Sequence, residues 1–268
     1  MWLNGVKMSR VNVNQQKARP KITNPEQIQS PELLAKSNPA NTEFANVQFE
    51  RVGFRYDRES EILRDVSFSL QPGSMTFVTG SSGAGKTTLL KLIYLHMRPS
   101  RGLITLFGQD TSQIERRSIP ALKRRMGIVL QDFHLIDHLS VFENVALPLR
   151  VAGRKRSDYR EDVLGLLKWV GLGPRAHALP PTLSGGEKQR AAIARAVIGK
   201  PEILIADEPT GNVDDDIGRR LIRLFAELNR LGTTTIIATH NMSLIPDGAH
   251  ILSIKDGHIT GSIHGTDI

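Results

Sequence analysis

Residues 80–87 read Gly80-Ser81-Ser82-Gly83-Ala84-Gly85-Lys86-Thr87 and match the phosphate-binding pattern G-x-x-x-x-G-K-[ST]. An apolar run at 75–79 precedes them, and apolar residues at helical spacing follow from Leu89 to Met97. This order predicts a strand, a loop and a helix. Glycines let the loop point several backbone N–H groups at one phosphate, and the start of the helix adds its positive dipole end. The stretch therefore predicts nucleotide binding.

Two side chains of this loop have distinct predicted roles. Lys86 supplies a positive charge for the terminal phosphates, and the Thr87 hydroxyl is placed to hold Mg²⁺. The loop residues that we expect to contact the nucleotide are Gly80, Ser81, Ser82, Gly83, Ala84, Gly85, Lys86, Thr87 and Thr88.

The composition is that of a globular protein that works without disulfides. The chain has 268 residues, enough for one large domain or two small ones, and 40% of them are apolar. No run approaches the ~18 apolar residues of a membrane span, and residues 1–10 lack the apolar core of a signal peptide. The absence of cysteine excludes cysteine-ligated metal and suits the cytoplasm. The net charge of +8 fits an anionic membrane surface, nucleic acid or simply a soluble surface rich in lysine and arginine.

The chain divides into a tail at 1–44 and a folded domain at 45–268. The tail is rich in Asn, Gln, Pro, Lys and Ser and has no apolar periodicity, so we expect it to be flexible. It holds six basic and three acidic residues, which makes it mildly basic. Contact with a membrane or partner and an inert extension both stay open as its role.

In the folded part, strand-like runs alternate with helical segments, which predicts an α/β domain with a largely parallel sheet. Residues 140–180 hold no comparable strand and show helical apolar spacing, so we expect a helical insert at about 132–190. The expected strands are 49–56, 67–70 and 103–107, followed by 126–130, 203–206 and 234–238. The last three are continuous apolar or β-branched runs, which are typical of strands covered on both faces.

Residues suited to phosphate chemistry follow four strands: Gly80, Gln131, the pair Asp207 and Glu208, and His240. The carboxyl ends of parallel strands share one edge, where ligands of open α/β sheets bind, so these segments should converge on one site. We expect Asp207 to hold Mg²⁺ and Glu208 to act as the general base for the attacking water. Gln131 is expected to contact the metal and the water, and His240 the terminal phosphate. The candidate catalytic residues are thus Lys86, Gln131, Glu208 and His240, and the candidate metal ligands are Thr87, Gln131 and Asp207.

A second candidate anion site lies at Leu183-Ser184-Gly185-Gly186-Glu187, directly before a strongly helical segment. Ser184 is a suitable N-cap, and Gly185 and Gly186 leave the first N–H groups of the helix open. A simple helix cap explains the same residues. If the segment does bind phosphate, one chain carries two half-sites, and a two-fold dimer that places each nucleotide between two copies is the simple solution.

Taken together, these motifs resemble those of ABC-type ATPase subunits in order and spacing. Residues 80–87 are similar to the Walker A motif of that family, Leu183–Glu187 to its signature, and Ile203–Glu208 to its Walker B motif. Other positions resemble the Q-loop (Gln131), the switch histidine (His240) and the D-loop (Gly211–Asp214). Tyr56 sits where the family stacks an aromatic ring on adenine, although a plain strand tyrosine explains it too.

The resemblance implies a P-loop NTPase of the ABC ATPase type, with a mixed sheet core, an N-terminal antiparallel β subdomain and a helical insert. It also implies hydrolysis of ATP to ADP and phosphate, with Mg²⁺, by an ATP-dependent homodimer.

Within the family, Asp207–Asn212 is similar to a group of lipoprotein-releasing, macrolide-export and cell-division ATPases. Residues 131–149 and 98–102 look most like the FtsE-type cell-division ATPases. That likeness implies an FtsX-like membrane permease as partner, docked near 133–139, and control of peptidoglycan hydrolases. It further implies a peripheral position on the cytoplasmic face of the bacterial inner membrane.

Three other functions compete with this one. A lipoprotein-release or macrolide and small-molecule export ATPase stays open, because the motifs of the ATPase do not separate these partners. A DNA-repair or ribosome-associated ATPase is disfavoured, because residues 88–182 leave no room for a long coiled coil and there is one ATPase unit. We therefore expect no specific nucleic acid. A non-hydrolysing scaffold is disfavoured by the presence of both Lys86 and Glu208.

Overall fold

A computed structural model describes residues 45–57, 60–211, 213 and 215–261. The tail predicted at 1–44 lies outside the described residues, as do Asn212 and Asp214 of the predicted D-loop. None of the helices in the described ranges is long and apolar enough to cross a membrane.

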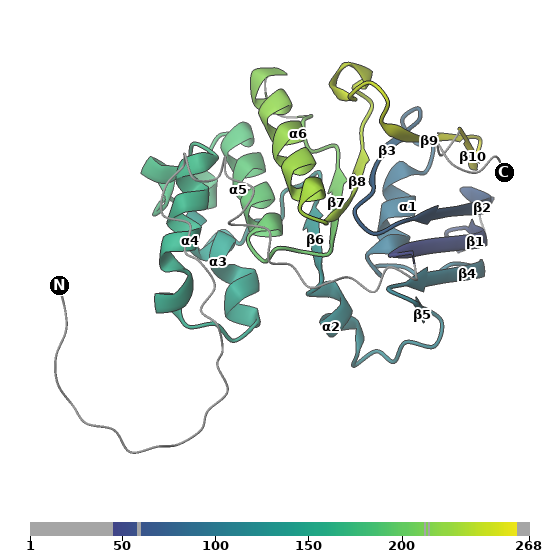
Figure 1. Cartoon of the computed structure of the whole chain (residues 1–268), viewed down its shortest axis with the longest axis horizontal. Helices are drawn as coiled ribbons and strands as arrows, with labels where there is room; N and C mark the ends of the chain where they lie inside the picture. Colours follow the sequence, from purple (N-terminus) through teal and green to yellow (C-terminus); the bar gives the residue numbers. More distant parts are fainter. Residues whose placement is uncertain (1–44, 58–59, 212, 214, 262–268) are drawn as a thin grey trace.

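A four-stranded antiparallel sheet lies at one end of the molecule (Figure 1). Its strands run in the order β2 (Leu63–Leu70), β1 (Val47–Phe54), β4 (Arg101–Leu106) and β5 (Gln109–Asp110). β2 begins at Leu63, whereas the sequence predicted a start at residue 67. The exposed Arg64 and Asp65 interrupt the apolar pattern of the strand, which explains why the prediction began too late. The buried face of this sheet carries Phe49, Phe68 and other apolar side chains that pack toward α1.

The second sheet has six strands and forms the centre of the domain. Its order is β10 (His258–Thr260), β9 (His250–Lys255), β3 (Met75–Thr79), β8 (Thr234–Ala238), β7 (Ile203–Asp207) and β6 (Met126–Val129). β9, β3, β8, β7 and β6 are parallel, and β10 is antiparallel to β9. β7 and β8 are buried along their whole length, as their continuous apolar runs predicted. The predicted α/β class with a mixed sheet core and an antiparallel β subdomain is confirmed.

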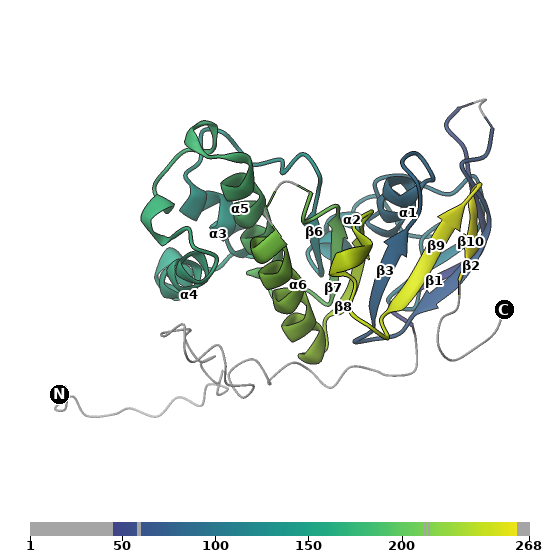
Figure 2. The same cartoon turned by 90° about the horizontal axis from the view of Figure 1, so that it is seen from above.

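Helices cover both sides of the mixed sheet. α1 (Lys86–Ile93) lies between the two sheets, and its buried Leu89 and Leu90 share one core with both (Figure 2). The other side is covered by α5 (Gly185–Val197) and α6 (Asp215–Arg230). The remaining helices are α2 (Ile119–Lys123), α3 (Val141–Val151) and α4 (Arg156–Trp169), with short 3₁₀ turns at Gly173–Arg175, Pro180–Thr182 and Met242–Leu244.

The helical region differs at both ends from the expected insert at 132–190. Residues 132–140 contain no helix and form a loop between β6 and α3. α5 starts inside the expected insert but continues to Val197 and packs against β6 of the core. The helices α3, α4 and α5 gather at the end of the molecule opposite the antiparallel sheet (Figure 1).

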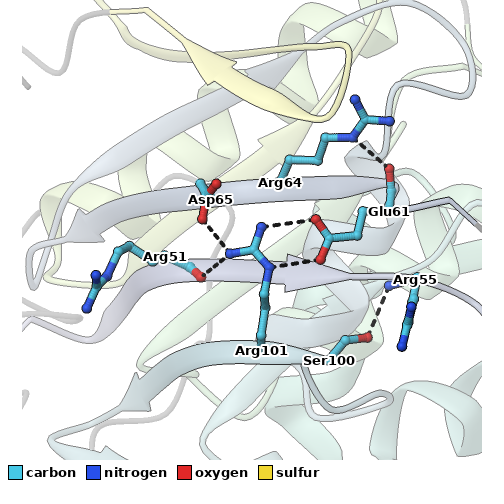
Figure 3. A network of polar contacts seen from close by, with 7 residues as sticks. All are labelled: Arg51, Arg55, Glu61, Arg64, Asp65, Ser100 and Arg101. Carbon is cyan, nitrogen blue, oxygen red and sulfur yellow. Dashed lines mark hydrogen bonds and ion pairs between the residues drawn. The ribbon is translucent and has the colours of Figure 1, made fainter.

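Arg101, the first residue of β4, ties the antiparallel sheet together at its surface (Figure 3). Its Nε and Nη2 donate to the carboxylate of Glu61 at 2.8 and 3.0 Å, and its Nη1 donates to the carboxylate of Asp65 and, at 3.4 Å, to the carbonyl oxygen of Arg51. These hydrogen bonds lower the pKa of both carboxyl groups. The contacts of Arg101 therefore join β1, β2, β4 and the segment that leads into β2.

We expect Arg101→Met to destabilise the protein more at neutral pH than in acid. The pKa values of Glu61 and Asp65 are lowered from 4.5 and 3.8, so their stabilisation is present above those values and lost as the pH falls below them. Urea unfolding at neutral pH and at a pH below 3.8 should show the gap between wild type and variant narrowing in acid. Arg223→Met, on the exposed side of α6, is the control. A gap of equal size at both pH values would contradict this assignment.

Candidate nucleotide-binding site

A pocket of about 520 Å³ lies at the carboxyl ends of β3, β6, β7 and β8. The structure therefore brings together the four strand ends that the sequence singled out. The pocket is lined by Ile62, Ser82, Gly83, Gly85, Lys86, Thr87, Thr88, Gln131, Asp207, Glu208, Gly211 and His240.

The loop between β3 and α1 owes its shape to two glycines that no other residue could replace easily. Gly80 has φ 149, and a Cβ atom there would lie 2.5 Å from the carbonyl oxygen of Ile254. Gly85 caps α1 with φ 108, and a Cβ atom there would lie 3.0 Å from Leu63 Cδ2. Residues with a Cβ atom are strained at such φ values, so the loop can adopt this backbone conformation only because glycine stands at these two positions.

Lys86 is folded back along this loop. Its Nζ donates to the carbonyl oxygens of Gly80 at 2.8 Å and Ser81 at 3.2 Å, and the residue is only 8% exposed. The side chain thus places a positive charge in the pocket at the N-terminus of α1, where the helix dipole is also positive. Both features favour an anionic group such as a phosphate.

Asp207 ends β7 and is 4% exposed. Burial raises the pKa of its carboxyl group, while a hydrogen bond from the Thr87 hydroxyl opposes this rise. Its Oδ1 is buried and has no hydrogen-bond partner among the described residues. A buried acceptor without a partner is costly, and a hard divalent cation would satisfy it. The carboxylate of Asp207, with the Thr87 hydroxyl beside it, therefore fits Mg²⁺.

Glu208 is held in an unusual backbone conformation beside Asp207. Its φ is 48, and its N–H donates to the carbonyl oxygen of Ala238 at 2.9 Å. The carboxylate is turned toward His240, with 2.8 Å between Glu208 Oε2 and His240 Nδ1. The backbone N–H of His240 also donates to that oxygen at 3.3 Å. Left-handed φ values are rare for residues with a Cβ atom and cluster at functional sites.

Tyr56 and Ile62 lie in the segment that connects β1 and β2. Tyr56 is 37% exposed, its ring packs edge-on against Phe54, and its hydroxyl lies 3.5 Å from Thr88 Oγ1. Tyr56 is therefore beside the pocket but not among the residues that line it. Ile62 does line the pocket, and sequence reasoning missed it because no motif marks it.

Ser184, Gly185 and Gly186 do not line this pocket. Ser184 is exposed and caps α5 in a capping box: its Oγ accepts from Glu187 N–H at 3.3 Å, and Glu187 Oε2 accepts from Ser184 N–H at 2.8 Å. The structure thus confirms Ser184 as a helix cap. The predicted role of these three residues at a nucleotide stays a prediction.

The segment at 133–139, where partner docking was expected, is part of the loop before α3. Phe133, Ile136 and Leu139 are half-buried, and Leu135 packs against the helical core. His134 and His138 are both exposed in this loop, so their spacing of four residues is not a helical one.

Comparisons with known proteins agree with this geometry. The ABC transporter family model matches residues 63–211. The chain is 46% identical over 218 residues to the cell division ATP-binding protein FtsE of Escherichia coli K12, covering 81% of this chain and 98% of that protein. It is 39% identical over 214 residues to the protein of the same name from Bacillus subtilis 168, covering 80% and 94%.

Two solved structures of MJ0796 also resemble this chain, each with a TM-score of 0.75 over 80% of this chain and 96% of theirs. One is the dimeric structure of this bacterial ABC transporter cassette, at 32% identity. The other is a dimeric post-hydrolysis state bound to ADP and Pi, at 31% identity.

Proposed function

Because this chain belongs to the ABC transporter family and is an ATP-hydrolysing subunit, we propose that it is an FtsE-type ATPase that drives a membrane complex in cell division. The observation that best supports this function is the single pocket that gathers Lys86, Gln131, Asp207, Glu208 and His240. Relatives named as cell division ATP-binding proteins in Escherichia coli and Bacillus subtilis support the cellular role.

In the proposed complex, the terminal phosphates of ATP lie at the loop 80–87. The buried ammonium group of Lys86 and the N-terminus of α1 attract them, and the open side of Tyr56 accepts the adenine ring. Thr87, Gln131 and Asp207 would hold Mg²⁺, which neutralises charge on the phosphate oxygens when it is bound.

Glu208 is the proposed general base. Its carboxylate accepts a proton from the attacking water, whose oxygen then bonds to the terminal phosphorus as the bond to ADP breaks. His240 contacts the same carboxylate at 2.8 Å and can orient it. Gln131 lines the same pocket and is proposed to position the water.

The complete site requires a second copy of the chain. Ser184 and Gly185, at the start of α5, are exposed outside the pocket, where they can meet a phosphate held by another chain. We propose a two-fold dimer in which each ATP lies between the loop 80–87 of one copy and Ser184–Gly186 of the other. The dimeric structures of MJ0796 support this arrangement.

The proposed partner is an FtsX-like permease, which would hold the chain at the cytoplasmic face of the bacterial inner membrane and pass its motion to peptidoglycan hydrolases. The half-buried apolar side chains of the 133–139 loop offer a surface for a helix of that permease.

Two measurements test this proposal. Phosphate release from ATP by the purified chain tests the ATPase. Co-expression with tagged permeases tests the partner, with lipoprotein-release and macrolide-export permeases as matched controls. We expect co-purification with the FtsX-like permease alone. Capture by a control permease instead would overturn the cell-division role while leaving the ATPase intact.

A further inference from the structure

The loop 131–140 joins the nucleotide pocket to the helical region. Its first residue, Gln131, lines the pocket at the end of β6, and its last residue, Ser140, caps α3. A loop without secondary structure needs other contacts to hold a side chain in one place. Two residues outside the loop provide those contacts, Arg195 and Asn144.

Arg195, on α5, binds the backbone directly after Gln131. Its Nη2 donates to the carbonyl oxygen of Phe133 at 2.7 Å, and its Nη1 donates to that of His134 at 2.6 Å. Phe133 and His134 both have left-handed backbones, with φ 57 and 45. Two such residues in a row are unfavourable without glycine, and they persist only where the surroundings hold them. The planar guanidinium, which donates to both carbonyl oxygens at once, is suited to hold this turn.

The guanidinium of Arg195 has no other polar partner among the described residues. Arg195 is half-buried, and burial lowers the pKa of its guanidinium group. Among the described residues, its hydrogen-bond partners are the two carbonyl groups, and no carboxylate pairs with it. Burial of a charge is costly, so a half-buried guanidinium that contacts only a backbone turn indicates that its role is to hold that turn.

Asn144, on α3, fixes the other end of the loop. It is fully buried, accepts from Ile136 N–H at 2.8 Å, and donates to the carbonyl oxygens of Ile136, Leu139 and Ser140 at 2.9–3.1 Å. The loop is therefore attached at both ends to helices that pack against each other. A displacement of α3 and α5 would carry the loop with them.

α5 is also the helix that Ser184 caps. Arg195 lies in the last turn of α5, about 16 Å along the helix from Ser184 at 1.5 Å per residue. α5 thus connects the proposed contact with the partner's nucleotide to the loop that positions Gln131 in the chain's own pocket.

We propose that Arg195 is a positioning residue that couples the two half-sites of one chain: it sets the place of Gln131 according to the position of α5. This inference deepens the proposed function and rests on it. When a nucleotide held by a partner engages Ser184 and shifts α5, Arg195 moves the turn at Phe133 and His134, and Gln131 moves with the turn. Hydrolysis in each pocket then depends on closure of the other.

The test compares steady-state ATP hydrolysis in Arg195→Met, Arg195→Lys and Gln131→Ala, and in the double variant Gln131→Ala/Arg195→Met. We expect Arg195→Met to lower kcat about tenfold with little change in KM, because misplacement of a positioning group by about 1 Å can cost up to about 100-fold. Arg195→Lys keeps the charge but loses the paired donors, so it should recover part of the rate. The kcat of the double variant should lie within about twofold of that of Gln131→Ala, because both changes remove the same contribution, that of a correctly placed Gln131.

Arg125→Met is the matched control. Arg125 also makes a paired interaction through its guanidinium, with Glu202 at 2.7 Å, but it lies just before β6, at the end of that strand opposite Gln131, and does not line the pocket. Its kcat and KM should match those of the wild type. The coupling would be overturned if kcat of the double variant fell by the product of the fold losses of the two single variants. An unchanged kcat in Arg195→Met would also overturn it. Arg195→Lys, the more conservative change, keeps the test valid if Arg195→Met does not fold. An inactive wild type would instead count against the proposed function.

Discussion

Glu208→Gln binds ATP with near wild-type affinity but hydrolyses it at least about 100-fold more slowly, since a general base contributes about 10²–10⁴-fold to a rate. The amide has the shape of the carboxylate but cannot accept the proton of the attacking water. Because binding precedes this step, the variant should collect in the ATP-bound state. Phosphate release measures kcat, and light scattering after gel filtration measures the mass of the ATP-bound form, which should be that of a dimer.

Glu202→Gln is the control for this change. Glu202 precedes β7 at the opposite end from Glu208 and pairs with Arg125 outside the pocket. Its loss should leave kcat unchanged. Normal turnover in Glu208→Gln would remove Glu208 from the proposed role of general base.

Lys86→Ala should lose ATP binding, with Kd rising about 100-fold or more. Loss of one member of a desolvated charge pair costs about 2–5 kcal/mol, and each 1.4 kcal/mol is a factor of ten. The change also removes the hydrogen bonds from Nζ to Gly80 and Ser81, so the loop loses contacts that shape it. Calorimetric titration with ATP measures Kd directly.

Lys168→Ala removes the same charge from an exposed position on α4 and should bind ATP as the wild type does. A thermal melt of Lys86→Ala establishes that the variant is folded. If folded Lys86→Ala kept the wild-type Kd, the nucleotide would not bind at the loop 80–87.

The features that the sequence predicted well are those that local chemistry determines. β7 and β8 were found nearly to the residue, because strands buried on both faces need continuous apolar runs. The phosphate loop was found because its glycines are required by backbone conformations that other residues resist. Ser184 was recognised as a cap because small polar residues before a helix form that contact by themselves.

The features that the sequence missed depend on tertiary contacts. β9 and β10 mix polar and apolar residues at one edge of the mixed sheet, so no run marked them. The helical insert predicted at 132–190 includes residues 132–140, yet their backbone forms a loop that Arg195 and Asn144 hold from elsewhere in the chain. Ile62 reaches the pocket only because β2 folds beside α1, and no local pattern reports that.

A structure of Glu208→Gln with ATP and Mg²⁺ bound would test most directly whether each nucleotide is bound between two copies of the chain. We expect two copies of the chain, with the triphosphate on Lys86 of one copy also touched by Ser184 and the N-terminus of α5 of the other. A triphosphate seated on Lys86 while Ser184 faces solvent in every assembly would contradict this arrangement.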